Sequence, residues 1–201
     1  MADGGMGVAG REALTCNKTP FRYKTPAKRP RMGRWQRMKF NLLDKIEEIS
    51  DTRIVAVKHV TLAEEYLADH FPTFPVLPGV MMLEALTQAA SWLLHRRSGF
   101  AKSFAVLKEA KNVKYGNFVA PGNYLRVEVE YLKQTDAGAT FKAGGMVNGS
   151  VAVAARIELA YFNLGDKQPQ LAELDARLIE HHRRRWALIA PHEAAVSLQL
   201  S

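Results

Sequence analysis

HFPTFPVLPGVMMLEALTQ, residues 70–88, joins a proline-rich loop to the start of a strongly apolar segment. Pro78 and Gly79 stand at the junction, and the apolar residues after them recur at helical spacing. Gly99 is a suitable stop, because glycine accepts the left-handed conformation that often ends a helix. The stretch therefore predicts a long apolar helix from about Gly79 to Arg97, around which the rest of the fold is expected to pack.

Strand patterns dominate the sequence after this helix. Asn148-Gly149 separates two β-rich runs and is the strongest hairpin signal in the chain, and residues 135–138 mark another turn. The segments that suit strands are 103–108, 113–119, 124–134, 139–147 and 150–162. One long apolar helix followed by neighbouring antiparallel strands predicts an α+β fold in which a curved sheet wraps the helix.

Three shorter elements are predicted before residue 70. Apolar residues at helical spacing favour a short helix, and they are Leu42, Leu43, Ile46 and Ile49. Residues 53–60 are rich in β-branched side chains and suit a strand. Thr61 is a candidate cap for a brief helix through Leu67, with Glu64 at the position that a capping box requires.

Basic residues gather at the N-terminus. Residues 1–37 hold nine Lys and Arg against two acids, a net charge of +7, whereas residues 38–164 carry +1 and residues 165–201 carry zero. The near-neutral core argues against a nucleic-acid reader, although a basic tail can bind polyanions weakly. We expect a disordered basic tail over residues 1–37, with Met38 as an alternative start of the protein, then one domain over 38–164 and a linker and helix over 165–201. The apolar seam of that last helix is predicted at Leu171, Leu174, Leu178 and Ile179.

Several classes of protein are disfavoured by composition. Cys16 is the only cysteine, so an intrachain disulfide and a cysteine zinc cluster are excluded, and a reducing cytosol is the expected location. No apolar run approaches the roughly 18 residues that a membrane span needs. The chain has no metal-ligand spacing and no glycine-rich phosphate loop, so neither a metal nor another cofactor is expected.

His70 and Glu84 are the residues of the opening stretch that can move protons. Glu84 shares one helical stripe with Gln88, Ser91 and His95, which is either a solvent-facing edge or the wall of a cleft. In a cleft, apolar neighbours such as Met82 would favour a protonated carboxyl group, which can act as a proton donor. A histidine beside Phe and Pro is more often packed than catalytic. The other histidines have no comparable setting, and the pair His181-His182, followed by three arginines, suggests the solvated end of a helix.

The stretch resembles the active-site signature of the hotdog-fold 3-hydroxyacyl-[acyl-carrier-protein] dehydratases of the FabZ type. The matching positions are His70, Phe71, Pro72, Pro75, Pro78, Gly79, Val80, Glu84, Ala85 and Gln88. The segment NVKYGNFVAPGN at residues 112–123 is also similar, and the resemblance covers roughly residues 38–162. It departs at Asp69 and Asn123, where the family usually has Gly and Asp, and neither change removes a catalytic group.

The resemblance implies an activity and a set of residues. His70 would be the general base and Glu84 the general acid in the reversible dehydration of a 3-hydroxyacyl thioester in fatty acid biosynthesis, and the site would be shared between two subunits. Substrate-binding positions implied by the same match are Gly79, Gln88, Phe71, Met81 and Met82. An acidic acyl carrier protein is the expected partner, and the candidate docking cations are Arg96, Arg97, Lys108, Lys111 and Lys114. A homodimer or a trimer of dimers is expected.

Two alternatives remain open on the sequence. A hotdog thioesterase would use a carboxylate to activate water rather than an acid–base pair. A non-catalytic acyl-binding or scaffold subunit would have no physical need for both His70 and Glu84.

Overall fold

A six-stranded antiparallel sheet forms the frame of the fold in a computed structural model that describes residues 40–192 and residue 194. Its strands are β1 (Lys45–Ile49), β2 (Arg53–His59), β3 (Phe104–Tyr115), β4 (Tyr124–Thr135), β5 (Gly138–Val147) and β6 (Ser150–Phe162). They lie side by side in the order β1-β2-β4-β5-β6-β3, so β1 and β3 form the two edges. The basic tail predicted over residues 1–37 lies outside the described residues.

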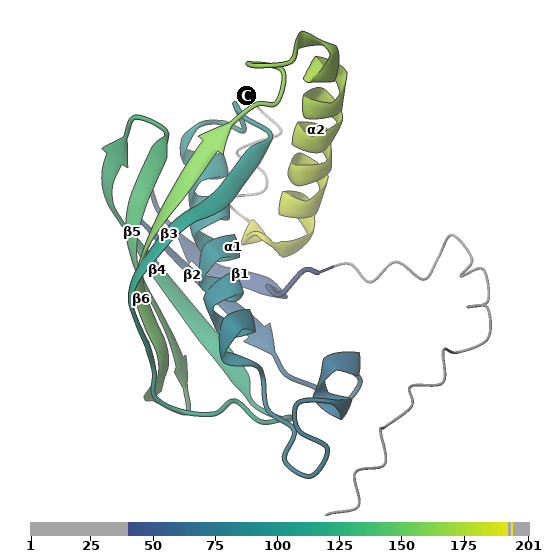
Figure 1. The fold of residues 1–201 in the computed structure, drawn as a ribbon, viewed down its shortest axis with the longest axis vertical. Helices are drawn as coiled ribbons and strands as arrows, with labels where there is room; N and C mark the ends of the chain where they lie inside the picture. The colour runs from purple at the N-terminus through teal and green to yellow at the C-terminus, as the bar shows by residue number, and fades with distance from the viewer. Residues whose placement is uncertain (1–39, 193, 195–201) are drawn as a thin grey trace, which may run out of the picture. The chain divides into compact units, whose positions relative to one another are not determined.

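The sheet curves around one long helix, α1 (Gly79–Arg97), as Figure 1 shows. Leu125, Phe141 and Ile157 of the sheet are fully buried, as are Leu86 and Leu93 of α1. Burial of large apolar side chains from both layers is the main source of stability for such an arrangement. The predicted α+β hotdog architecture is therefore confirmed.

The ends of α1 fall where the sequence predicts them. Pro78 precedes the helix in an extended conformation, with φ −56° and ψ 139°. Ser98 caps the other end, and Gly99 follows it with φ 62°, a left-handed conformation that costs glycine little. The helix is buried on more than one side, although Val80 in its first turn is 71% exposed.

The short helix predicted over residues 42–49 is wrong, because this segment forms β1. The register of β1 against β2 shifts between Ile46 and Glu48, which marks a β-bulge. The extra residue brings both Ile46 and Ile49 to the core, although they are three positions apart. A spacing of three looks like a helical period in the sequence, and the bulge explains it.

A bulge also explains why one strand looks like two. The segments predicted separately at 103–108 and 113–119 belong to the single strand β3, which ends at Tyr115. Its register against β6 shifts twice, and Asn112 has φ 52° at the second shift. Asn tolerates this left-handed conformation better than most residues. At the predicted hairpin, Asn148 and Gly149 have φ 48° and 77°, as a type I′ turn requires.

The brief helix predicted from Thr61 is shorter and begins later. It is a 3₁₀-helix, η1 (Glu65–Ala68), with Glu64 at its N-cap. The Thr61 backbone N–H donates to Glu64 Oε1 at 3.1 Å, which is one half of the predicted capping box.

The helical segment near the C-terminus consists of η2 (Pro169–Leu171) and α2 (Ala172–Ile189).

The helix predicted near the C-terminus is confirmed as α2, but only part of its predicted seam faces the core, where Ile179 packs. Leu174 is exposed, and the residues of α2 that are buried are Asp175, Trp186 and Ile189. Asp175 accepts hydrogen bonds from the Leu164 and Gly165 backbone N–H groups, at 3.0 and 2.7 Å. This carboxylate is the hydrogen-bond acceptor for the backbone of the turn before the helix, which explains why a polar residue occupies the inner side of α2.

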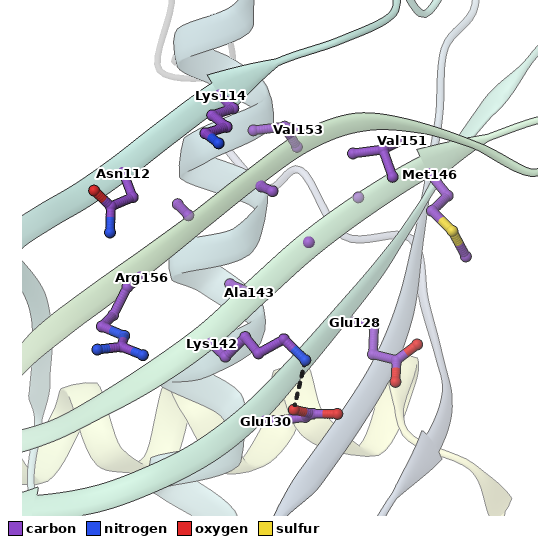
Figure 2. A pocket seen from close by; sticks show the side chains of 14 residues that line it. Asn112, Lys114, Glu128, Glu130, Lys142, Ala143, Met146, Val151, Val153 and Arg156 are labelled. Carbon is purple, nitrogen blue, oxygen red and sulfur yellow. Dashed lines mark hydrogen bonds and ion pairs between the residues drawn. The ribbon is translucent and has the colours of Figure 1, made fainter.

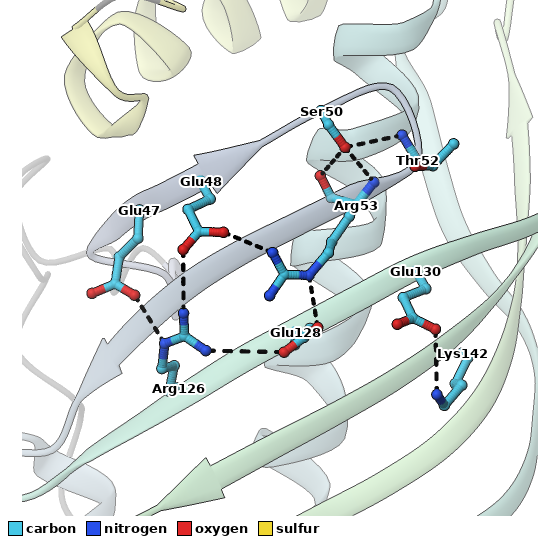
Figure 3. A network of polar contacts seen from close by, with 9 residues as sticks. All are labelled: Glu47, Glu48, Ser50, Thr52, Arg53, Arg126, Glu128, Glu130 and Lys142. Carbon is cyan, nitrogen blue, oxygen red and sulfur yellow. Dashed lines mark hydrogen bonds and ion pairs between the residues drawn. The ribbon is translucent and has the colours of Figure 1, made fainter.

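Charged side chains join β1, β2 and β4 on the face of the sheet turned away from α1 (Figure 3). Arg53 contacts Glu48 and Glu128, each at 2.7 Å, and Arg126 contacts Glu47 at 3.1 Å. Exposed ion pairs of this kind contribute little stability each. Their alternation across three strands favours one register over its neighbours, because a slip would bring like charges together.

Candidate active site

His70 lies in a loop whose backbone hydrogen bonds hold it closely. Its backbone N–H donates to the Tyr66 carbonyl at 3.1 Å, and its own carbonyl accepts from Val76 N–H at 3.0 Å. The ring nitrogen Nδ1 lies 3.1 Å from the Val76 carbonyl oxygen. A carbonyl oxygen only accepts, so this contact assigns the proton to Nδ1 and leaves a free lone pair on Nε2. The half-buried ring can therefore accept a proton at Nε2.

A cavity of about 330 Å³ opens beside this ring. It is lined by His70, Phe71, Leu77, Gly79, Met82, Tyr115, Gly116, Asn117 and Phe118. Four of the residues predicted from the sequence are thus brought together. Met81 is buried but is not among the lining residues. The wall supplied by residues 115–118 was missed, although the segment NVKYGNFVAPGN carried the only signal for it.

Gly79 places a helix N-terminus at the cavity. In the part of the chain that the structure describes, no group accepts a hydrogen bond from its backbone N–H. Free N–H groups at a helix N-terminus attract negative charge. A β-carbon at Gly79 would come within 3.0 Å of Tyr115 Cε1, so a larger residue would displace that ring. The site therefore offers a hydrogen-bond donor with room for a ligand to approach the backbone.

Glu84 lies on α1 but does not line this cavity. At about 100° per residue, Glu84 is turned roughly 140° from Gly79 around the helix, so both cannot face the same cavity of one chain. Its Oε1 accepts a hydrogen bond from Gln88 Nε2 at 2.9 Å. Gln88 Oε1 in turn accepts from Leu42 N–H at 2.9 Å, which fixes the amide with its nitrogen toward Glu84. One chain thus presents an oriented carboxyl group away from its own histidine.

A second hollow crosses the sheet on the side away from α1 (Figure 2). Its volume is about 570 Å³, and charged side chains such as Lys142, Glu130 and Arg156 surround a floor that includes Gly144 and Ala154. Lys142 and Glu130 are paired at 3.3 Å. None of the predicted acid–base residues lines this groove, so it has no part in the candidate site.

The lysines predicted to dock a carrier protein all lie on β3. Lys108 pairs with Glu158 at 2.8 Å, and Lys111 pairs with Glu109 at 2.9 Å. Lys114 lines the groove on the outer face of the sheet. The two paired lysines have less positive charge to offer a partner than their sequence suggests, because a carboxylate already lies beside each.

The predicted docking arginines lie at the end of α1, apart from these lysines. Arg97 stacks over the Tyr131 ring, with 4.0 Å between its Cζ atom and the ring centroid, and it donates to the Asp51 carbonyl. Arg96 makes no ion pair with the residues that the structure describes. Because β5 and β6 lie between β4 and β3, Arg97 does not share one patch with the three lysines on a single chain.

Two histidines, His95 and His182, are packed between α1 and α2, so the solvated position predicted for His182 is wrong. His95 is only 2% exposed, and its ring centroid lies 4.6 Å from that of His182. Burial, with a smaller effect of His182, lowers the pKa of His95 to about 3. Burial also lowers the pKa of His182, whose Nε2 contacts the Ser103 carbonyl at 3.0 Å. Both rings are neutral near pH 7 and serve as packing groups.

Within residues 40–192 and residue 194, no group of three His, Cys, Asp or Glu side chains is arranged to hold a metal ion. In the same part of the chain, no helix is both long and apolar enough to cross a bilayer.

Comparison with known proteins identifies the family. A family model described as a FabA-like domain matches residues 35–156, which include the His70 loop, α1 and most of the sheet. The chain belongs to the FabA-like family. The predicted family is confirmed, and so is the prediction of a dehydratase at the level of the family.

Two curated relatives of this chain have the same name. A protein of Clostridium perfringens named 3-hydroxyacyl-[acyl-carrier-protein] dehydratase FabZ is 37% identical over 124 residues, which cover 62% of this chain and 89% of the relative. The protein of the same name from Solibacter usitatus is 34% identical over 139 residues, covering 69% and 86%. α2 lies beyond the region matched by the family model.

A solved structure agrees on the fold. The dehydratase heterocomplex ApeI:P from Xenorhabdus doucetiae contains a chain that superposes with a TM-score of 0.52 at 20% identity, covering 67% of this chain and 89% of that one.

Proposed function

We propose that the protein catalyses the reversible dehydration of 3-hydroxyacyl-[acyl-carrier-protein] to the trans-2-enoyl product in fatty acid biosynthesis. The observation that carries the proposal is the setting of His70. Its Nδ1 is held by the Val76 carbonyl, and its ring lines a cavity together with Gly79 at the N-terminus of α1. The names of the FabZ relatives support the choice of substrate.

The proposed chemistry removes one proton and one hydroxyl group from neighbouring carbons. His70 Nε2 takes the proton from Cα, and the electron pair of that bond forms the Cα–Cβ double bond. The C–O bond at Cβ breaks as protonated Glu84 donates a proton to the departing hydroxyl, which leaves as water. The Gly79 N–H donates to the thioester oxygen, where negative charge develops. The same steps in reverse hydrate the enoyl thioester.

Two subunits are needed for this chemistry. Because Glu84 is turned away from the cavity of its own chain, the carboxyl group beside His70 must come from a second copy. β3 has a free backbone edge 12 residues long, which can pair with the same strand of a partner. Apolar side chains near the cavity are exposed in one chain, Phe118 at 67% and Phe71 at 50%. We propose a homodimer, alone or assembled into a trimer of dimers.

The cavity suggests where the acyl group binds. Met82 and Leu77 form apolar parts of its wall, and Phe74 packs edge-on against Phe118 at its rim, with 5.5 Å between ring centroids. Such an apolar wall suits an alkyl chain better than a polar ligand. The thioester end would lie near Gly79, and the carrier protein, which is acidic, would stay outside the cavity.

The test is a direct assay with 3-hydroxyacyl carrier protein, in which enoyl formation is followed by absorbance. We expect the native enzyme to form enoyl product, and His70→Ala and Glu84→Gln to lower the rate by about 10²- to 10⁴-fold. His59→Ala is a matched control, because the His59 side chain is exposed and, among the charged side chains that the structure describes, pairs with Asp44 at 3.5 Å. Equal rates for the native enzyme and His70→Ala would contradict the proposal. Release of free thiol without enoyl product would indicate a thioesterase instead.

A further inference from the structure

A buried lysine lies in the strand that precedes the loop of the proposed base. Lys58, near the end of β2, is only 6% exposed. Its ammonium group lies 2.9 Å from Glu64 Oε1 and also donates to the His59 carbonyl. A buried cation is costly unless it is paired and hydrogen-bonded, and this one is both.

Glu64 connects this lysine to a tyrosine. Its Oε1 also accepts from the Thr61 backbone N–H at 3.1 Å, and its Oε2 accepts from the Tyr66 hydroxyl. Burial alone would raise the pKa of Glu64, but the hydrogen bonds from Lys58 and Tyr66 outweigh it and lower that pKa. Burial and the bond to Glu64 raise the pKa of the Tyr66 phenol. At neutral pH the carboxylate is therefore ionised and the phenol keeps its proton.

Tyr66 joins these side chains to the histidine loop through its backbone. The Tyr66 carbonyl accepts hydrogen bonds from Asp69 N–H at 3.3 Å and from His70 N–H at 3.1 Å. Tyr66 is thus fixed at its hydroxyl by Glu64, while its carbonyl holds the backbone of His70. The opposite side of the same loop is closed by Val76, which contacts both the backbone and the ring of His70.

We infer that Lys58, Glu64 and Tyr66 form a positioning network that fixes the loop carrying His70. The inference rests on the proposed role of His70 as the general base. Buried ion pairs contribute little net stability compared with apolar residues of the same size. We therefore assign the Lys58–Glu64 pair to fixing the positions of its neighbours rather than to stabilising the fold. Position matters here because a shift of about 1 Å between a base and its proton can cost about a hundredfold in rate.

The test compares two variants that each remove one tyrosine hydroxyl. Tyr66→Phe keeps the ring and breaks the bond to Glu64. Tyr131→Phe is the matched control, since its hydroxyl donates, among the residues that the structure describes, to Gln134 on β4 at 3.0 Å. For Tyr66→Phe in the full-length enzyme, we expect kcat to fall about tenfold, with KM within about twofold of native. Tyr131→Phe should leave kcat within about twofold of native.

An isotope effect separates positioning from a general structural role. With substrate deuterated at Cα, the kinetic isotope effect on kcat in Tyr66→Phe should equal or exceed the native value, because proton removal is the slowed step. Glu64→Gln, which keeps the side-chain shape but removes its charge, should show the same pattern. A kcat within twofold of native, a smaller isotope effect, or a fall in kcat matched by an equal loss of folded protein in circular dichroism would overturn the inference.

The proposed function itself is tested separately in the same assay. If His70→Ala keeps native activity, the role of His70 as the base fails. If His70→Ala is inactive and Tyr66→Phe is unchanged, His70 remains the base and the positioning network alone is disproved.

Discussion

The Tyr115 ring packs against the backbone of Gly79, so closely that a β-carbon on Gly79 would lie 3.0 Å from Tyr115 Cε1. One residue comes from the end of β3 and the other begins α1, and both line the cavity beside His70. The space for a thioester at the helix N-terminus is therefore set by a contact between two elements far apart in the sequence.

Gly79→Ala should lower kcat/KM at least about a hundredfold, because the added methyl group occupies the space beside the proposed oxyanion donor and pushes against Tyr115. In Gly79→Ala/Tyr115→Ala the ring is absent, so the thermal stability lost in the single variant should be partly regained. Activity assays and thermal unfolding of the two single variants and the double variant measure this coupling. Strictly additive changes in stability would show that the two residues do not interact.

Gln88 should affect both activity and stability, because it donates to Glu84 and accepts from Leu42 N–H. Gln88→Met removes these bonds and the one from Nε2 to the Phe40 carbonyl, at 3.1 Å, and it leaves the Leu42 backbone N–H without its partner, at a cost of about 1–3 kcal/mol. Gln88→Glu can still accept from Leu42 but has no N–H to donate to Glu84, so it should lose more activity than stability. Urea unfolding and steady-state kinetics distinguish the two effects. Native kcat in Gln88→Glu would mean that Glu84 needs no orienting donor.

Acid should weaken the packing of α2 on α1 through His95. The folded-state pKa of His95, about 3, lies below the ordinary value of 6.5, so the unfolded chain binds more protons between these limits. Its contribution to stability is complete above pH 6.5 and is lost as the pH falls toward 3. Urea unfolding at several pH values should show this slope, and it should be smaller in His95→Phe, which cannot titrate. An equal slope in both proteins would contradict the assignment.

The sequence predicted the elements whose signals are local. Pro78 and Gly99 bound α1, and Asn148-Gly149 forms the hairpin turn, because each position depends mainly on its own backbone preferences. The His70 loop and α1 were likewise recognisable as a unit. The same signature carried the family, which the comparison confirmed.

The sequence failed where a distant contact overrides the local pattern. The bulge after Ile46 produced a false helical period, and Asn112 divided the pattern of one continuous strand. His182 looks solvated in the sequence, and the stripe that holds His95 could be read either way, because the sequence does not show that α1 and α2 pack on each other. Helical spacing gives the angle between Gly79 and Glu84, but the side of α1 that faces the cavity could not be read from it, since that depends on where β3 places its wall.

The most direct test of a site shared between subunits is complementation between two inactive variants. His70→Ala and Glu84→Ala are each expected to be inactive alone. When the two chains are co-expressed in equal amounts with different purification tags, a mixed dimer has one site with both defects and one with neither. The population should then show about a quarter of native specific activity in the enoyl assay, and the isolated mixed dimer about half. Mixed dimers with no more activity than either variant alone would contradict the shared site.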